Sequence, residues 1–167
     1  MIAIKNVLVA TDFSPASDTA LAYGRELARH FGGALHILHV VENVHAYTVG
    51  TDAAIGALIP STLQDELEKS ARRQLEALVR EDDRRELKAT AVLLTGHGTA
   101  IEIVTFAKES GIDIIVVGTT GRGPMSHLLM GNVAEKVVRL APCPVLSVRH
   151  PEHEFVLPDA LQRVPQS

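Results

Sequence analysis

Glycine and small polar residues are concentrated in one stretch of the chain, GTTGRGPMSHLLMGN at residues 118–132. Gly118, Gly121 and Gly131 have no side chain, so the backbone there can approach a ligand closely or adopt a positive φ. Asn132 begins a predicted helix, whose free N–H groups and positive dipole end favour an anion. The stretch is therefore suited to binding phosphate, although glycines alone predict an ordinary turn equally well.

The stretch differs from two common phosphate-binding sequences. No Gly-Lys-Ser/Thr follows, as a Walker A loop would require, and the glycines follow the fourth predicted strand rather than the first, unlike a Rossmann fingerprint. Asn132 is also among the best helix N-caps, and Glu135 completes a capping box. We expect Asn132 to cap the helix in any case and to contact phosphate in addition.

Five short apolar segments alternate with helical patterns along the chain. The first and fourth are apolar almost throughout, as expected for strands that are covered by helices on both faces. The alternation predicts an α/β fold with a mostly parallel sheet and right-handed crossovers. The predicted strands are residues 6–11, 34–41, 89–95, 113–118 and 144–149.

Recognisable signals start and stop the predicted helices. Ser14 with Pro15 starts the first helix, which ends at Gly32-Gly33. Capping boxes start three further helices, and the charged run EDDRRE at residues 81–86 is interpreted as a solvated helix end. The boxes are Ser61 with Gln64, Thr99 with Glu102, and Asn132 with Glu135.

Two segments do not fit the alternation. Residues 42–60 form a predicted loop whose length is typical of a lid, a binding loop or disorder. Residues 150–167 hold three prolines, and this tail is expected either to dock on a neighbour or to be disordered. We therefore expect a single domain over residues 1–149, followed by a C-terminal tail.

The carboxyl ends of the predicted strands locate a candidate ligand site. In open parallel sheets, ligands bind beyond these ends, at the point where the strand order reverses. Ala10, Thr11 and Asp12 end the first strand, Val40 ends the second, and Gly118 ends the fourth. If the fourth strand lies beside the first, Asp12 faces the glycine-rich stretch across a crevice.

Composition restricts the class of protein. Sixteen basic and twenty acidic side chains give a net charge of −4, which argues against nucleic-acid binding because that needs a concentrated basic face. No apolar run approaches the roughly 20 residues of a membrane span. The N-terminus lacks the pattern of a signal peptide, and Cys143 has no partner for an internal disulfide. A cytoplasmic protein without a membrane partner is expected.

Histidine and cysteine side chains give no metal site at this level. His36 and His39 are three residues apart on a predicted strand, so their side chains point to opposite faces and cannot share an ion. Cys143 lies between prolines and is interpreted as a small packing residue rather than a nucleophile. Asp12 and Ser14 lack a histidine placed to complete a triad. No catalytic residue and no metal ligand are therefore predicted.

Three segments together closely resemble the universal stress protein family, in its ATP-binding branch: NVLVATDFSPASDTALAYGRELA, LHILHVVE and GTTGRGPMSHLLMGNVAEKVVRLAPCPVLSVR. That branch carries G-x-x-G, nine residues, then G-Ser/Thr, and here Asn132 replaces the hydroxyl residue. The resemblance covers about residues 3–149. It implies a Rossmann-like, adenine nucleotide alpha hydrolase-like fold, an open five-stranded parallel sheet in the order 3-2-1-4-5 with helices on both faces.

The resemblance also implies the ligand, which is ATP, or AMP or ADP, with Mg²⁺ as a possible companion. Asp12 would accept hydrogen bonds from the ribose hydroxyls, the role with better precedent, or act as a carboxylate on the magnesium side. Val40 would provide an apolar wall and a backbone amide edge for adenine. The implied nucleotide-binding residues are Ala10, Thr11, Asp12, Val40, Gly118, Gly121, Arg122, Gly131, Asn132 and Val133.

The expected function is that of a nucleotide-responsive regulator of stress tolerance rather than an efficient enzyme, with at most slow ATP hydrolysis or autophosphorylation. The resemblance implies a homodimer through the last strand, residues 144–149, whose exposed edge must be paired or protected. One alternative is a dimeric interaction protein that no longer binds nucleotide. Another is an ATP-consuming transferase or hydrolase with a second substrate pocket under residues 42–60.

Overall fold

The computed structural model describes residues 1–44, 60–119 and 132–151 of the chain. Its strands form one five-stranded sheet in the order β3-β2-β1-β4-β5, and every neighbouring pair is parallel. This confirms the predicted fold class and strand order. The strands are β1 (Asn6–Ala10), β2 (Ala34–Glu42), β3 (Thr90–Gly96), β4 (Ile114–Thr119) and β5 (Val145–Arg149).

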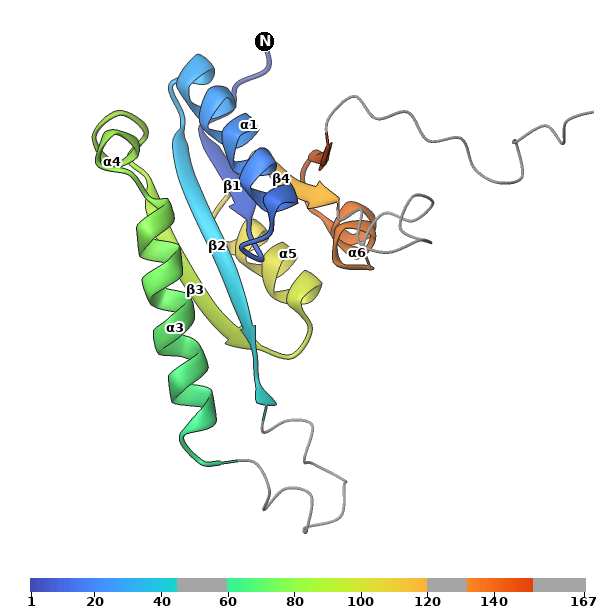
Figure 1. Cartoon of the computed structure of the whole chain (residues 1–167). Coiled ribbons are helices and arrows are strands. Elements are labelled where there is room, and N and C mark those ends of the chain that lie inside the picture. The colour runs from blue at the N-terminus through green and yellow to red at the C-terminus, as the bar shows by residue number, and fades with distance from the viewer. Residues whose placement is uncertain (45–59, 120–131, 152–167) are drawn as a thin grey trace, which may run out of the picture.

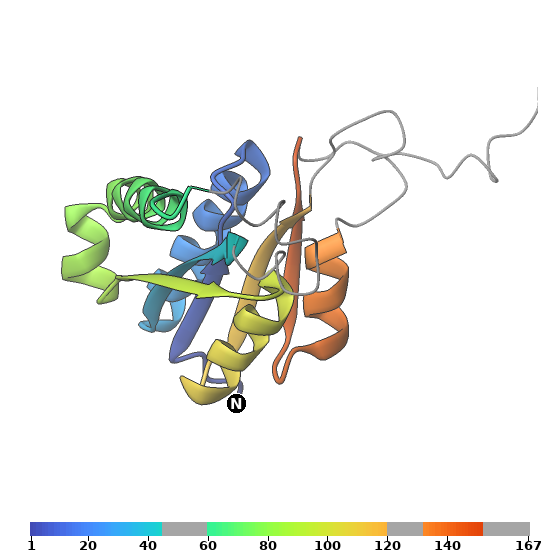
Figure 2. The same cartoon turned by 90° about the horizontal axis from the view of Figure 1, so that it is seen from below.

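Helices cover both faces of the sheet, as predicted. One layer holds α1, α3 and α4, and the other holds α5 and α6 (Figures 1 and 2). The helices are α1 (Pro15–Phe31), α3 (Leu63–Leu78), α4 (Glu81–Leu87), α5 (Thr99–Glu109) and α6 (Asn132–Leu140). Within the described ranges, none of them has the length and apolar character that a membrane span requires.

The sheet separates two apolar cores, which explains why its central strands are apolar throughout. Successive side chains of a strand point to opposite faces. Val7 and Val9 pack in the core beneath α1, while Leu8 packs in the core beneath α5. All three are completely buried, so a polar residue at any of these positions would lose its hydration without gaining a partner.

Helix α1 begins and ends as its sequence predicts. The Ser14 side chain accepts a hydrogen bond from the backbone N–H of Ser17, and Pro15 occupies the first helical position, where its missing N–H costs nothing. Gly32 ends the helix in the left-handed region, with a φ of 64°, which glycine adopts without steric cost. The start of α1 is therefore held firmly beside the carboxyl end of β1.

Two of the predicted capping boxes are wrong. Helix α3 has Thr62 rather than Ser61 at its N-cap position, without a side-chain cap. Gln64 instead accepts a hydrogen bond from the backbone of Val44 at 3.0 Å, an interaction with a distant segment. Helix α5 begins after Gly98, whose φ of 98° makes the turn, so Thr99 lies inside the helix rather than capping it.

The interpretation of residues 81–86 as a solvated helix end is wrong for Asp83. These residues belong to α4, a separate short helix that folds back towards α1 (Figure 1). Asp83 is only 3 % exposed, because its carboxylate pairs with the Arg25 guanidinium of α1. The Arg25 Nε and Nη2 atoms lie 3.0 and 2.8 Å from Asp83 Oδ2. One residue of this charged segment therefore forms a buried ion pair with α1 instead of facing the solvent.

Candidate functional site

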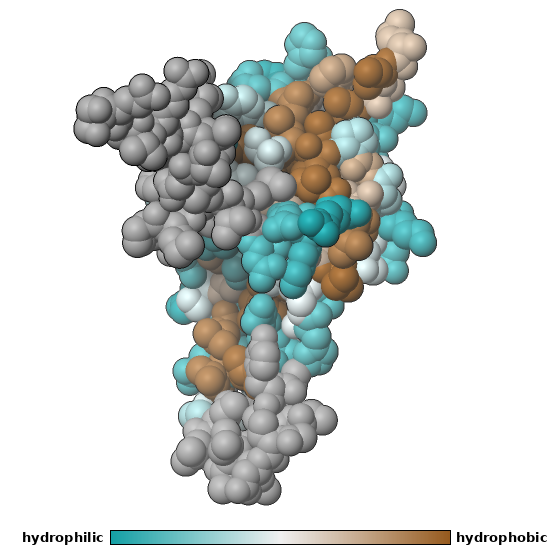
Figure 3. Space-filling view, turned by 90° about the vertical axis from the view of Figure 1, so that its right-hand side faces the viewer, coloured by the Kyte–Doolittle hydropathy of each residue, from teal (hydrophilic) through white to brown (hydrophobic). Residues whose placement is uncertain are grey.

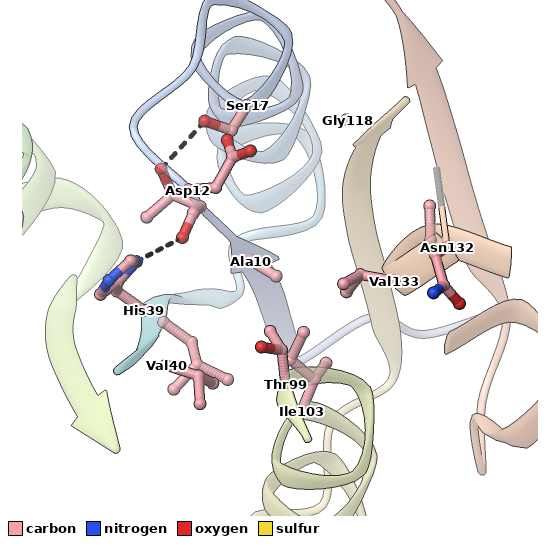
Figure 4. A pocket seen from close by; sticks show the side chains of 13 residues that line it. Ala10, Asp12, Ser17, His39, Val40, Thr99, Ile103, Gly118, Asn132 and Val133 are labelled. Carbon is pink, nitrogen blue, oxygen red and sulfur yellow. Dashed lines mark hydrogen bonds between the residues drawn. The ribbon is translucent and has the colours of Figure 1, made fainter. Parts of the chain in front are cut away.

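A cavity of about 280 Å³ lies where the strand order reverses, at the carboxyl ends of β1, β2 and β4 (Figure 4). This volume is near the lower end of the range for small-molecule sites. We call it the switch-point pocket, defined by its lining residues Ala10, Thr11, Asp12, Ser17, Leu38, His39, Val40, Thr99, Ile103, Gly118, Asn132, Val133 and Ala134.

Asp12 lies in a tight turn between β1 and α1. Its Oδ1 accepts a hydrogen bond from the backbone N–H of Ser14 at 3.0 Å. Burial raises the pKa of the Asp12 carboxyl, but hydrogen bonds from Ser14 and Ser17 outweigh that effect and hold the pKa below its ordinary value of 3.8. Asp12 is therefore ionised at neutral pH, and its exposed carboxylate can accept hydrogen bonds from a ligand.

The turn places Phe13 at a φ of 61°, a conformation that bulky side chains rarely adopt. Backbone strain of this kind persists only where surrounding contacts enforce it. Here the Phe13 N–H donates to Thr11 Oγ1 at 3.0 Å, and the Phe13 ring packs on the His39 ring with centroids 4.3 Å apart. These contacts fix the direction in which Asp12 leaves the strand.

His39 supports the same turn from β2. Its Nδ1 lies 2.7 Å from the backbone oxygen of Thr11, and because a carbonyl only accepts, Nδ1 carries the proton and donates. His36 faces the opposite side of the sheet, where its ring contacts Phe106 of α5. The two histidines thus lie on opposite faces, as predicted. His39 is a pocket residue that the sequence interpretation considered only as a metal ligand.

The hydroxyl groups of Thr11 and Ser17 line the pocket beside Asp12 and form a hydrogen bond with each other. The Ser17 Oγ donates to the backbone oxygen of Ser14 at 2.9 Å, and it lies 3.0 Å from Thr11 Oγ1. Ser17 and Thr11 are both buried. Their hydroxyls are therefore committed to holding the end of β1 against the first turn of α1.

Gly118 ends β4 in close contact with α1. A Cβ atom at this position would lie 2.5 Å from the backbone oxygen of Ala16 and 2.8 Å from the backbone nitrogen of Ser17. Cβ atoms essentially never lie this close to a backbone atom, so the close packing of the strand on the helix requires glycine. The sequence predicted that Gly118 allows a ligand to approach; the structure shows that it allows the helix to approach.

Helix α6 begins on the opposite side of the pocket from Asp12 (Figure 4). Asn132 is its first residue, and both Asn132 and Val133 are exposed and line the pocket. The free N–H groups of a first helical turn carry a partial positive charge and favour an anion. Residue 131, which precedes it, lies outside the described residues, so the capping role of Asn132 stays a prediction.

The other end of the pocket is apolar. Val40 of β2 and Ile103 of α5 face each other across it, below Ala10 (Figure 4). Leu38 also lines the pocket and is fully buried. Thr99, at the start of α5, adds one hydroxyl to this apolar wall. The pocket therefore has a charged, hydroxyl-lined end and an apolar end, an arrangement that suits a ligand with a polar and a flat apolar part.

The structure brings most of the predicted ligand-binding residues together around the switch-point pocket. Those that line it are Ala10, Thr11, Asp12, Val40, Gly118, Asn132 and Val133. Gly121, Arg122 and Gly131 lie outside the described residues. Their part in binding stays a prediction, as does that of the residues in the pocket.

The sequence analysis missed several pocket residues that helices supply, chiefly Ser17, Thr99 and Ile103. Thr99 and Ile103 are four residues apart on α5, so they share one helix face. That spacing was visible in the sequence. The missing information was that α5 crosses the sheet beneath the end of β2, which depends on tertiary packing.

An open parallel sheet with a pocket at its switch point defines the class of α/β proteins that bind small ligands there. Residues 3–149 match the universal stress protein family. The match spans most of the chain, and the strand order agrees with it. The chain belongs to the universal stress protein family.

Individual relatives agree with this assignment. The chain is 33 % identical over 150 residues to universal stress protein MJ0531 of Methanocaldococcus jannaschii, covering 90 % of this chain and 85 % of the relative. Its fold is similar to that of universal stress protein UspA from Lactobacillus plantarum, with a TM-score of 0.72, 25 % identity and coverage of 89 % and 100 %.

A further solved relative contains a nucleotide. The universal stress protein from Archaeoglobus fulgidus in complex with dAMP has the same fold, with a TM-score of 0.61 and 24 % identity, covering 89 % of this chain and 99 % of that one.

Proposed function

We propose that this protein binds an adenine nucleotide, ATP or else AMP or ADP, in the switch-point pocket and acts as a nucleotide-responsive regulator. The observation that carries the proposal is the position of Asp12, which faces the start of α6 across a pocket whose remaining end is apolar (Figure 4). A nucleotide has the matching three parts: a flat base, a ribose with hydroxyls, and an anionic phosphate chain.

The ribose is assigned to the Asp12 end. An ionised carboxylate accepts two hydroxyl hydrogen bonds, and charge-assisted bonds of this kind are stronger than neutral ones. The lowered pKa of the Asp12 carboxyl keeps it in the accepting form. A magnesium ion beside the phosphates is the alternative partner for this carboxylate.

The phosphates are assigned to the start of α6, where Asn132 and Val133 present the first-turn N–H groups of the helix. Gly121, Arg122 and Gly131 belong to this part of the proposal through the family motif. The dAMP complex of a protein with the same fold supports an adenine nucleotide as the class of ligand.

Regulation is favoured over efficient catalysis by the chemistry of the described pocket. A general base works best with a pKa near the operating pH, whereas the pKa of Asp12 is below 3.8. Slow hydrolysis at most is expected, and the bound nucleotide would act by changing the surface that other proteins contact.

Copurification and thermal stability test the proposal together. Mass spectrometry of the denatured protein is expected to detect an adenine nucleotide. ATP at about 100 times its Kd should stabilise the protein by about 2.7 kcal/mol, which raises the Tm of a protein of this size by about 5–11 °C. Failure to copurify a nucleotide, together with an unchanged Tm in ATP, would overturn the proposal.

A second proposal concerns assembly, and a different observation favours it. Strand β5 is an edge of the sheet that the described residues form. The side of the molecule that carries β5 and α6 shows a band of apolar surface (Figure 3). Val138 and Leu140 of α6 are 43 % and 52 % exposed. An unpaired edge beside apolar surface is a template for another chain. We propose a homodimer in which two copies of β5 pair.

Light scattering after size exclusion tests the dimer. Ser147 is the central residue of β5 and is exposed, so Ser147→Lys brings like charges close together in a symmetric pair. The variant is expected to be monomeric at concentrations where the wild type is dimeric. Gln74→Lys, on the exposed side of α3, adds the same charge elsewhere and should leave the dimer intact. A monomeric wild type would contradict the proposal.

A further inference from the structure

The His39 side chain connects β2 to the end of β1, at the point where the two strands separate. Their backbone pairing ends with a hydrogen bond from the Thr11 N–H to the Leu38 oxygen, at 2.9 Å. One step further on, the Thr11 oxygen accepts from a side chain, because His39 Nδ1 lies 2.7 Å away (Figure 4). Beyond Ala10 the chain turns into α1, so His39 continues a connection between β1 and β2 that began as backbone pairing.

The His39 ring contacts the same turn at a second place. It packs on the Phe13 ring with centroids 4.3 Å apart, and Phe13 holds a φ of 61° that bulky residues adopt only where contacts enforce it. Asp12 lies between Thr11 and Phe13 in the chain. His39 therefore holds the residue before Asp12 through its Nδ1 atom and the residue after it through its ring.

The orientation of the Asp12 carboxylate depends on this turn. Its Oδ1 reaches past Phe13 to the backbone N–H of Ser14, at 3.0 Å, so a relaxation of Phe13 to a negative φ would rotate Asp12 relative to α1. Hydrogen bonds weaken steeply when their angle or distance changes. A binding group must therefore be held within about 0.5 Å of its productive position by the residues around it. His39 provides that support from a different strand.

We propose that His39 is a positioning residue for nucleotide binding. Its Nδ1–H bond to the Thr11 carbonyl keeps Asp12 oriented towards the ribose hydroxyls, and the ring contact with Phe13 adds to this effect. The inference rests on the proposed function and deepens it, because recognition of the ribose then depends on β2 as well as on the turn that carries Asp12. His39 acts on the ribose through Asp12 and leaves the phosphate contacts unchanged.

Two substitutions separate the donor of His39 from its ring. His39→Asn keeps an N–H donor, since the amide nitrogen is attached to Cγ as Nδ1 is in histidine, but it lacks the ring. His39→Phe keeps a ring and lacks the donor. Calorimetric titration compares ATP with 2′,3′-dideoxy-ATP, which has neither ribose hydroxyl. Wild type should prefer ATP.

The loss of one hydrogen bond has a modest effect on affinity, so His39→Phe is expected to weaken ATP binding about 3- to 10-fold. Binding of dideoxy-ATP should stay within error of the wild type. His39→Asn should retain the preference for ATP, because the donor to Thr11 is kept. A merely structural contribution of His39 would weaken both nucleotides alike and would not be rescued selectively for ATP.

Two controls accompany these variants. His36→Phe makes the same change on the same strand and also removes an Nδ1 hydrogen bond, here to Thr90 Oγ1, but His36 faces the opposite side of the sheet and contacts Phe106. The ratio of the two Kd values should therefore match that of wild type. In an Asp12→Ala background, His39→Phe should not change the ratio further, because the two residues act as a unit.

The possible results distinguish the role of His39 from the proposed function. If wild type binds ATP but His39→Phe weakens both nucleotides equally, or neither, the positioning role is overturned and the proposed function stands. The same conclusion follows if His39→Asn loses the preference for ATP as completely as His39→Phe does, or if wild type binds the two nucleotides equally well. If wild type binds neither nucleotide, the proposed function itself fails.

Discussion

Asp12 and Asp83 show how one side-chain type serves two purposes in this fold. Hydrogen bonds hold the pKa of both carboxyls below the ordinary value, against the effect of burial. Asp83 is closed in by the Arg25 guanidinium and the backbone N–H of Arg80. Asp12 is exposed and bonded by the backbone N–H of Ser14, and within the described residues it has no ion-pair partner.

This difference in hydrogen-bond partners and exposure indicates which of the two carboxylates can bind a ligand. A guanidinium that binds a carboxylate through two nitrogens occupies the acceptor sites that a ligand would need. Asp83 therefore joins α4 to α1 and contributes to stability. Asp12 keeps acceptor capacity on the side that faces the switch-point pocket, so its contribution should appear in binding. Four of the five predictions below test this division, and the last concerns the start of α6; the largest expected effect comes first.

Asp83→Ala should destabilise the protein by about 3–5 kcal/mol, because it leaves the Arg25 charge buried without a partner. Urea unfolding measures this effect. Asp82→Ala is the matched control, since Asp82 pairs with Arg85 at the surface, and its removal should cost less than about 1 kcal/mol. If Asp83→Ala lowers the free energy of unfolding no more than Asp82→Ala does, the ion pair of Asp83 does not stabilise the fold.

Asp12→Ala should weaken nucleotide binding far more than it weakens folding. Hydrogen bonds to a charged group contribute about 1.5–3 kcal/mol, which corresponds to about a 10- to 150-fold increase in Kd. Calorimetry with ATP measures the affinity, and urea unfolding of the same variant measures stability. Asp18→Ala, an exposed change in the first turn of α1, is the control. An unchanged ATP affinity would contradict the assignment of the ribose to Asp12.

Acid should reduce the contribution of Asp83 to stability. Its folded pKa lies below the unfolded value of about 3.8, so the unfolded chain binds the proton more readily and stability rises with pH in this range. The contribution is complete above the unfolded pKa and is lost as the pH falls through the folded pKa. Unfolding of wild type and Asp83→Asn should therefore differ by a constant amount from pH 7 to about 5 and converge in stronger acid.

The difference in unfolding free energy between wild type and Asp12→Asn should also shrink as the pH falls, but by a smaller amount than for Asp83→Asn. Asp12 is exposed, and solvent screens its interactions more effectively. A larger acid dependence for Asp12 than for Asp83 would reverse the division drawn above.

Asn132→Ser should produce the smallest effect. It restores the hydroxyl that the family motif carries, and a hydroxyl donates to phosphate from a smaller volume than an amide. The change is expected to strengthen ATP binding relative to AMP binding, since the proposed assignment puts the larger part of the triphosphate near α6. Calorimetry with both nucleotides gives the ratio, and an unchanged ratio would show that Asn132 already serves as well as serine.

Local sequence was sufficient for the strands and for α1. Apolar runs such as the one from Val7 to Val9 form central strands because both of their faces must be buried. Ser14 and Gly32 act within one turn of their own positions, so local chemistry decides the ends of α1. The predicted capping box at Ser61 is wrong because Gln64 bonds to the backbone of Val44 instead. The one at Thr99 is wrong because Gly98 occupies the N-cap position of α5.

Part of the candidate site could be predicted in the same way. Asp12, Val40 and Gly118 follow the ends of strands, and a parallel sheet brings all such ends to one edge. Ser17 and Thr99 could not be assigned to the pocket, because their places depend on where α1 and α5 cross the sheet.

The sequence by itself determined the alternation of strands and helices, the family and the edge of the sheet where a ligand would bind, because these follow from periodicity and from residues close together in the chain. Only the tertiary structure decided which carboxylate is neutralised by a buried ion pair. Arg25 and Asp83 are 58 residues apart, and no local pattern pairs them. Packing between distant elements separates a structural charge from one that can bind a ligand.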